Sequence, residues 1–135
     1  MIRALGILGA ALVLLAAARG GRLRTGAEAV RRFERFFKGD LAPRLAAGER
    51  RPLAALLAHR PSAELRPCRE VHGRVSDTLG PAARSGAVLH GSPGALDRGG
   101  DCWALEYPGH LVPGMGAVLE PATGEVLLVW RIPEG

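Results

Sequence analysis

The chain has 135 residues, of which 47% are hydrophobic and 23% are charged. This length and composition are typical of one small globular domain, and they exclude a disordered chain or a protein of several domains. The net charge of +5 is unevenly distributed: residues 19–60 carry eleven basic and four acidic side chains, whereas residues 61–135 carry six and nine. Aromatic residues make up only 4%, and no nucleic-acid-binding motif is present, so the basic half favours an anionic membrane surface over nucleic acid.

The first 24 residues predict a targeting segment. Arg3 precedes the apolar run Ala4–Ala18, which ends in an A-x-A cleavage signal and is followed by the basic flank Arg19–Arg24. The run is about 22 Å long as a helix, shorter than a hydrocarbon core of about 30 Å. We therefore expect a signal peptide or membrane anchor over residues 1–24 and one domain over residues 25–135, exported or held at a membrane. If the segment remains as an anchor, the positive-inside rule favours a cytoplasmic C-terminal part, so the topology stays open.

An amphipathic helix is predicted after this segment. Thr25 has the character of an N-cap and Glu28 stands at N3, which together form a capping box. Apolar residues follow at helical spacing, and basic residues take the other face. The apolar stripe consists of Val30, Phe33, Phe36, Phe37 and Leu41, and the basic face of Arg31, Arg32, Arg35 and Lys38. We expect the stripe to face the core; the alternative is a helix lying in the membrane interface.

Two shorter helices and a strand are predicted next. Leu41–Ala47 is interpreted as one short helical segment, and a second helix is expected to begin near Pro52 and to stop before Pro61. Apolar and polar residues then alternate over Val71–Ser76, which predicts a strand.

The last third of the chain predicts a sheet. Residues of Trp103–Tyr107 alternate, and two apolar segments, Ala117–Leu119 and Glu125–Ile132, flank the turn Glu120–Glu125, with the second segment expected to be covered on both faces. Residues 87–90 predict a weaker strand, and residues 91–100 an exposed connection. We therefore predict an α+β fold: a hydrophobic segment, amphipathic helices, and a four- to five-stranded antiparallel sheet that ends in a β-hairpin and has helices on one face.

The end of the chain resembles the PepSY-type pattern of small exported domains. In that pattern an aromatic–apolar strand is followed by an apolar strand, an acidic-x-x-Thr-Gly-Glu-Val turn and a last strand, matched here by Trp103–Tyr107 and Ala117–Leu127. The resemblance implies a binding or protease-regulating module and supplies no catalytic residues. Phe33–Leu45 is similar to the end of the first helix in NTF2-like domains. This gives the alternative of a cone fold that binds a small ligand or acts as an enzyme or immunity protein, its cavity lined by His72, Trp103, Tyr107 and Trp130.

Cys68 and Cys102 are the two cysteines of the chain. In an oxidising compartment they predict a disulfide that closes a loop of about 34 residues, whereas a cytosolic domain would hold two buried thiols. A metal site would combine them with His72 and either His90 or His110. On the predicted strand Cys68 and His72 would lie about 13 Å apart, too far for one zinc ion, so no metal or cofactor is predicted.

No catalytic residues are predicted. Gly91–Gly94 differs from a nucleophile elbow, because Pro93 removes the backbone N–H that would stabilise an oxyanion. Asp97, Asp101, Glu106 and His110 are interpreted as solvated loop residues. We therefore expect a non-enzymatic binding domain whose partner, besides the membrane, is an envelope protein or a peptide.

The segment from Tyr107 to Met115 is the candidate recognition loop, because loops carry function on rigid scaffolds. Its candidate binding residues are Tyr107, His110, Leu111, Val112 and Met115. The alternative is that its apolar side chains pack under the sheet.

Overall fold

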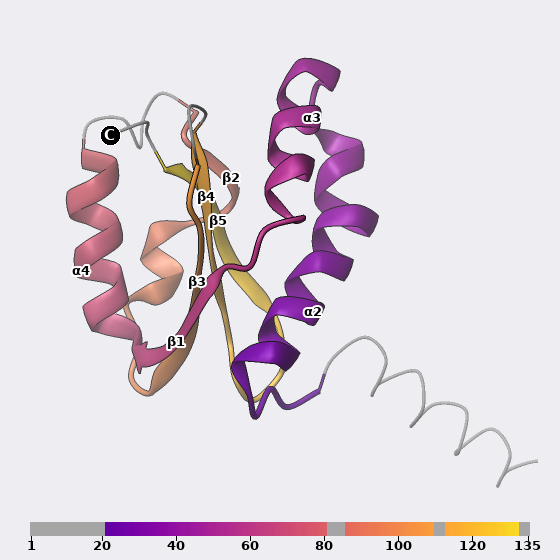
Figure 1. Ribbon diagram of the computed structural model, residues 1–135. Helices are drawn as coiled ribbons and strands as arrows, with labels where there is room; N and C mark the ends of the chain where they lie inside the picture. Colours follow the sequence, from indigo (N-terminus) through magenta and orange to yellow (C-terminus); the bar gives the residue numbers. More distant parts are fainter. Residues whose placement is uncertain (1–20, 81–85, 110–112, 133–135) are drawn as a thin grey trace, which may run out of the picture.

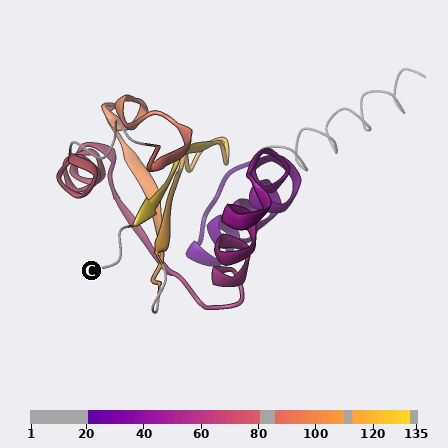
Figure 2. The same ribbon diagram turned by 90° about the horizontal axis from the view of Figure 1, so that it is seen from above.

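A five-stranded antiparallel sheet separates two groups of helices (Figures 1 and 2). The computed structural model describes residues 21–80, 86–109 and 113–132. The predicted α+β fold is confirmed. In chain order the elements are α2 (Gly26–Phe36), the π-helical turn η1 (Phe37–Leu41), the 3₁₀ turn η2 (Ala42–Arg44), α3 (Ala47–Leu56), β1 (Ser62–Pro67), α4 (Cys68–Leu79), β2 (Val88–Gly91), the 3₁₀ turn η4 (Pro93–Leu96), β3 (Asp101–Tyr107), β4 (Gly114–Leu119) and β5 (Val126–Ile132).

The strand order is β1-β3-β4-β5-β2. All six residues of β4 are buried, and β5 is an inner strand, as its apolar sequence predicts. The predicted hairpin between them is confirmed. Its turn is closed by the Gly124 N–H, which donates to the Glu120 carbonyl at 2.8 Å, and Gly124 has a φ of 74° that favours glycine.

Helix α2 begins as predicted. The Glu28 N–H donates to Thr25 Oγ1 at 3.2 Å, and the Glu28 carboxylate accepts the Arg24 N–H at 2.7 Å, one residue before the N-cap. Phe33 and Phe37 are completely or almost completely buried, and the basic residue between them, Arg35, is exposed. The apolar stripe is therefore part of the protein core and is not free to enter a membrane interface.

The two short helices differ from the prediction. Residues 41–44 continue the turns that follow α2, and α3 begins at Ala47, five residues before Pro52. Pro52 lies inside α3, on its exposed side, where a missing backbone hydrogen bond can be replaced by water.

The strand predicted over Val71–Ser76 is wrong, because these residues lie in α4. Val71, Val75 and Leu79 are spaced four residues apart and are all buried, as expected for one face of a helix. The neighbouring strand β1 was not predicted; five of its six residues are exposed, and Ala63 is the one residue that is partly buried.

Helices cover both faces of the sheet, not one (Figure 2). The α2 side packs on Trp103, Leu105 and Tyr107 of β3, whereas α4 and η4 pack on the opposite face around Val118 and Trp130. The connection between residues 91 and 100 is correspondingly only partly exposed: it contains η4, in which Leu96 is fully buried.

Residues 21–24, assigned to the basic flank from the sequence, belong to the folded body. The Leu23 N–H donates to the Pro121 carbonyl at 2.7 Å, and the Trp103 indole N–H donates to the Leu23 carbonyl at 3.1 Å. The chain therefore enters the domain beside the β4–β5 turn. Across residues 21–80, 86–109 and 113–132, no helix has the length and apolar character to cross a membrane.

Candidate functional site

The predicted disulfide is present between Cys68, the first residue of α4, and Cys102, in β3. Both residues are fully buried. Cys68 and His72 are one helical turn apart, so the reason given for excluding a metal, a long separation on a strand, was wrong. The Cys68 sulfur is nevertheless bonded to Cys102, and the described part of the chain contains no cluster of three metal-ligating side chains.

The candidate recognition loop is framed by two core residues. Tyr107 and Met115 lie opposite each other in the β3–β4 ladder, and both are fully buried. The Tyr107 ring lies 5.7 Å from that of Phe33, and its hydroxyl has no hydrogen-bond partner among the described residues. Burial, together with the charge of Glu34, raises the pKa of Tyr107. These two residues therefore pack in the core, and the predicted binding residues His110, Leu111 and Val112 lie outside the described residues.

The four side chains proposed for an NTF2-like cavity do not converge. Trp103 and Tyr107 belong to the core on the α2 side of the sheet, whereas Trp130 belongs to the core on the α4 side. His72 lies on α4. No single cavity is lined by all four.

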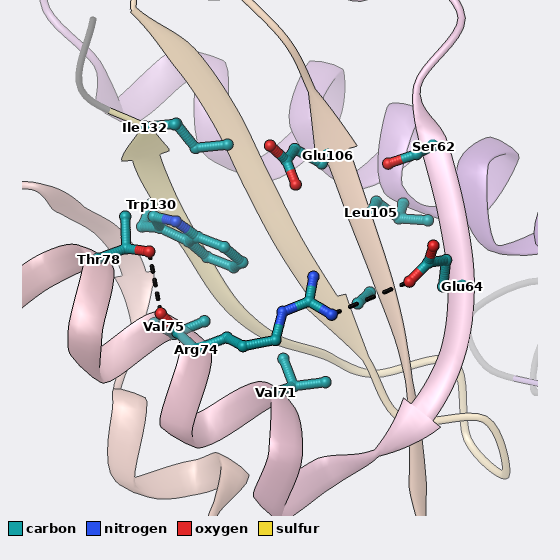
Figure 3. A pocket seen from close by; sticks show the side chains of 11 residues that line it. Ser62, Glu64, Val71, Arg74, Val75, Thr78, Leu105, Glu106, Trp130 and Ile132 are labelled. Atoms are coloured by element: carbon teal, nitrogen blue, oxygen red, sulfur yellow. Dashed lines mark hydrogen bonds and ion pairs between the residues drawn. The ribbon is translucent and has the colours of Figure 1, made fainter. Parts of the chain in front are cut away.

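A groove of about 140 Å³ lies between α4 and the sheet (Figure 3). This α4 groove is smaller than small-molecule pockets, which measure about 300–1,000 Å³, and its size suits one side chain. Its apolar surfaces are formed by Val71, Val75, Ala104, Trp130 and Ile132, Leu105 of β3 borders it, and its polar groups belong to Ser62, Glu64, Arg74, Thr78 and Glu106.

The carboxylates of the α4 groove differ in their pairing. Glu64 forms ion pairs with Arg66 at 3.0 Å and with Arg74, which reaches across the groove, at 4.0 Å (Figure 3). Glu106 is exposed, and its carboxylate forms no ion pair or hydrogen bond with another described residue. The groove therefore offers one unpaired carboxylate, and its chemistry suits a cationic group rather than an anion.

The remaining candidate residues are dispersed. Ser92 Oγ accepts the Gly94 N–H at 3.3 Å and caps η4, and Asp97 pairs with Arg69 at 3.8 Å. The His90 ring lies 3.1 Å from an Arg44 guanidinium nitrogen and packs edge-on against Phe36. The structure does not bring these three side chains together into a nucleophile–base pair. Of the sequence candidates, Glu106 and Trp130 line the groove, and Glu64 and Arg74 were missed because their elements were not recognised.

Comparison with known proteins finds no matching family model, no matching curated protein and no matching solved structure. The resemblance to PepSY-type domains stays a prediction, carried by the sequence of β3 and of the β4–β5 hairpin.

Proposed function

We propose that this protein is a non-enzymatic binding domain, exported and held at a membrane by its N-terminal segment, with the α2–α3 side of the sheet facing the lipid surface. The observation that carries the proposal is the division of charge by the sheet. Residues 21–60, which form that side, contain ten basic and four acidic residues, whereas the described residues after position 60 contain five and eight. Anionic head groups attract a basic layer of this kind.

The exposed face of α2 is the centre of the basic layer. Arg31 and Arg35 of α2 and Lys38 of η1 are exposed, and partial burial first and the charge of Arg35 second lower the pKa of Arg32. An anionic surface attracts a cluster of exposed cationic side chains of this kind. The chain enters the domain at Gly21, next to this helix, so a tether would hold the basic layer close to the membrane.

The disulfide supports export. Disulfides persist in oxidising compartments and are rare in the cytosol, so the Cys68–Cys102 bond favours a domain outside the cytosol over the cytoplasmic topology suggested by the flanking charges.

The orientation can be measured with the full chain in nanodiscs of zwitterionic or anionic phospholipid. Both native cysteines are bonded, so a single introduced cysteine can be labelled with a fluorophore. Gly39→Cys places the label beyond α2 and Ser76→Cys places it on α4; both positions are exposed and uncharged. We expect a head-group quencher to quench the label at position 39 more strongly than at position 76 in anionic discs, with little difference in zwitterionic discs.

A charge-reversed protein provides the control. Replacing Arg31, Arg35 and Lys38 by Glu should remove the preference for position 39 while the tether stays in the disc. Equal quenching of the two labels in anionic discs contradicts the proposed orientation. Recovery of the full-length chain from the soluble cytosolic fraction of expressing cells contradicts the proposed location.

A further inference from the structure

Strand β1 forms an open edge of the sheet. Five of its six residues are exposed, whereas every residue of the inner strand β4 is buried. Figure 1 looks onto β1, and no other described helix or strand lies in front of it. Edge strands carry unpaired backbone groups and can pair with another chain unless something covers them.

The register shows which backbone groups of β1 face outward. The Cys68 N–H donates to the Gly100 carbonyl at 2.9 Å, one step beyond the pairing of Pro67 with Asp101, so residues 68 and 100 extend the same ladder. Hydrogen-bonded and non-bonded pairs alternate in an antiparallel ladder. The even-numbered residues of β1 therefore bond to β3, and the N–H and C=O groups of Ala63 and Leu65 point to the free edge.

The two faces of this edge differ in chemistry. Ser62 and Glu64 pair with Glu106 and Ala104 on the face toward α4, next to the α4 groove. On the opposite face Leu65 is 49% exposed, although it is a large apolar residue. Ser62 is small, so a long side chain on an added strand can pass over it toward the unpaired Glu106 carboxylate. Glu106 belongs to β3, which would lie about 10 Å, or two strand spacings, from the added strand.

We propose that the edge of β1 binds an extended peptide segment of a partner protein, which adds to the sheet as a further strand and alternates basic with apolar side chains. Its backbone bonds to Ala63 and Leu65, its basic side chains face Glu106, and its apolar side chains cover Leu65. The charge of the described residues after position 60, five basic against eight acidic, is complementary to such a peptide. The inference rests on the binding part of the proposed function and is independent of the cellular location.

The test uses the full chain in detergent and a labelled peptide with three Lys-Val repeats. We expect saturable binding, and at saturation a slowing of amide hydrogen exchange at Ala63 and Leu65 of about tenfold or more. Exchange at these two outward amides reports strand addition directly, whereas an electrostatic contact elsewhere leaves it unchanged.

Two substitutions of Leu65 distinguish the contribution of its backbone N–H to peptide binding from that of its side chain. Leu65→Pro removes the outward N–H but no bond to β3, and proline is tolerated on edge strands. We expect it to weaken peptide binding about tenfold or more, because a ladder bond and its geometry are lost. Leu65→Val keeps the N–H and should bind within about threefold of the original protein.

A second pair of variants tests the charge. Glu106→Gln should lower the affinity for the Lys-Val peptide about threefold, whereas Asp77→Asn, the same change of charge at an exposed position of α4, should leave the affinity unchanged. A Glu-Val peptide should not bind the original protein measurably.

Unchanged exchange at Ala63 and Leu65 in the saturated complex overturns the inference, and so does full binding by a folded Leu65→Pro variant. The absence of peptide binding overturns it as well. If the chain instead forms a dimer that Leu65→Pro dissociates, the edge belongs to a second copy and the peptide proposal is wrong. None of these outcomes alters quenching at position 39 in nanodiscs, so failure of this inference is distinguishable from failure of the proposed membrane orientation.

Discussion

At the scale of single residues, Gly116 and Trp130 depend on each other. They lie directly opposite in the β4–β5 ladder, and the indole ring covers the glycine on the α4 side of the sheet. A Cβ atom on Gly116 would stand 2.2 Å from Cζ2 of Trp130. The close approach of the ring therefore requires a glycine at position 116. Trp130 is itself buried, with 7% of its surface exposed.

Gly116→Ala should accordingly destabilise the domain by about 1–3 kcal/mol, because the ring must move in a packed core. Trp130→Ala removes the ring and should cost about 3–5 kcal/mol. The free energy of unfolding in urea measures both. Gly73→Ala is the matched control: apart from its chain neighbours and the backbone of its own helix, no atom lies within 4 Å of its added Cβ, and alanine is the better helix former, so it should stabilise by about 0.5–1 kcal/mol. Equal effects of the two glycine substitutions would show that Trp130 does not fill this space.

Tyr107 is the single tyrosine of the chain and carries a buried hydroxyl without a described partner. Its pKa is raised by burial first and by the charge of Glu34 second. In the unfolded chain the hydroxyl loses its proton near pH 10, whereas in the folded protein it retains it. The unfolded state therefore binds fewer protons above that pH, and stability must fall as the pH rises further.

Tyr107→Phe tests this account. At pH 7 it should leave the free energy of unfolding unchanged or raise it by about 1 kcal/mol, because no hydrogen bond is lost. Above pH 10 the free energy of unfolding of Tyr107→Phe should increasingly exceed that of the original protein. Tyrosinate absorbance of the original protein should appear only on unfolding, and ionisation near pH 10 in the folded state would refute the burial of this hydroxyl.

At the scale of elements, α4 shows why a short periodic segment can be misassigned. Val71 and Val75 fit an alternation of period two if Gly73 is counted as apolar, and they equally fit one face of a helix. Asp77 interrupts the alternation, whereas Leu79 continues the helical spacing, and Gly73 is exposed. The helix could therefore be predicted from the sequence if the apolar pattern was followed for one more turn.

The Cys68–Cys102 disulfide fixes the start of α4 to the sheet. Beyond this bond, α4 is held mainly by the side chains of Val71, Val75 and Leu79. The disulfide closes a loop of 34 residues, and in the chain-entropy model a cross-link over a loop of that length stabilises the folded state by about 3–4 kcal/mol.

Replacing both cysteines by Ala should lower the free energy of unfolding by about that amount and increase amide exchange in α4 more than in β4 and β5. Thiol labelling of the unreduced, denatured original protein should find no free thiol. Two labelled cysteines would show that the bond is not formed and would remove the argument for export.

At the scale of the whole molecule, the sheet turns a division of charge along the sequence into a division in space. The unequal halves are visible in the composition, since eleven of the basic residues lie between positions 19 and 60. Their separation onto opposite sides of the molecule requires that α2 and α3 lie on one face of the sheet and α4 on the other (Figure 2). The composition does not show which face of the sheet a helix covers. Only the fold therefore shows that the basic and acidic residues lie on opposite sides of the sheet.

The candidate site could be predicted only in part. Glu106 was singled out from the sequence, but as a solvated residue. The open edge at Ala63 and Leu65 was not anticipated, because an edge strand with one exposed leucine and alternating charges resembles a loop. What marks β1 as a strand is its pairing with β3, a contact between residues about 40 positions apart.

The sequence by itself determined the features that depend on neighbouring residues: the capped start of α2 at Thr25, its buried phenylalanine stripe, and the Gly124 turn between two apolar strands. These follow from local hydrogen bonds and from the periodicity of apolar side chains. Only the tertiary structure decided that helices cover both faces of the sheet, that Gly116 lies under Trp130, and that β1 has a free edge. Each of these depends on which distant segments pack together, and the burial that selects the arrangement is a property of the whole chain.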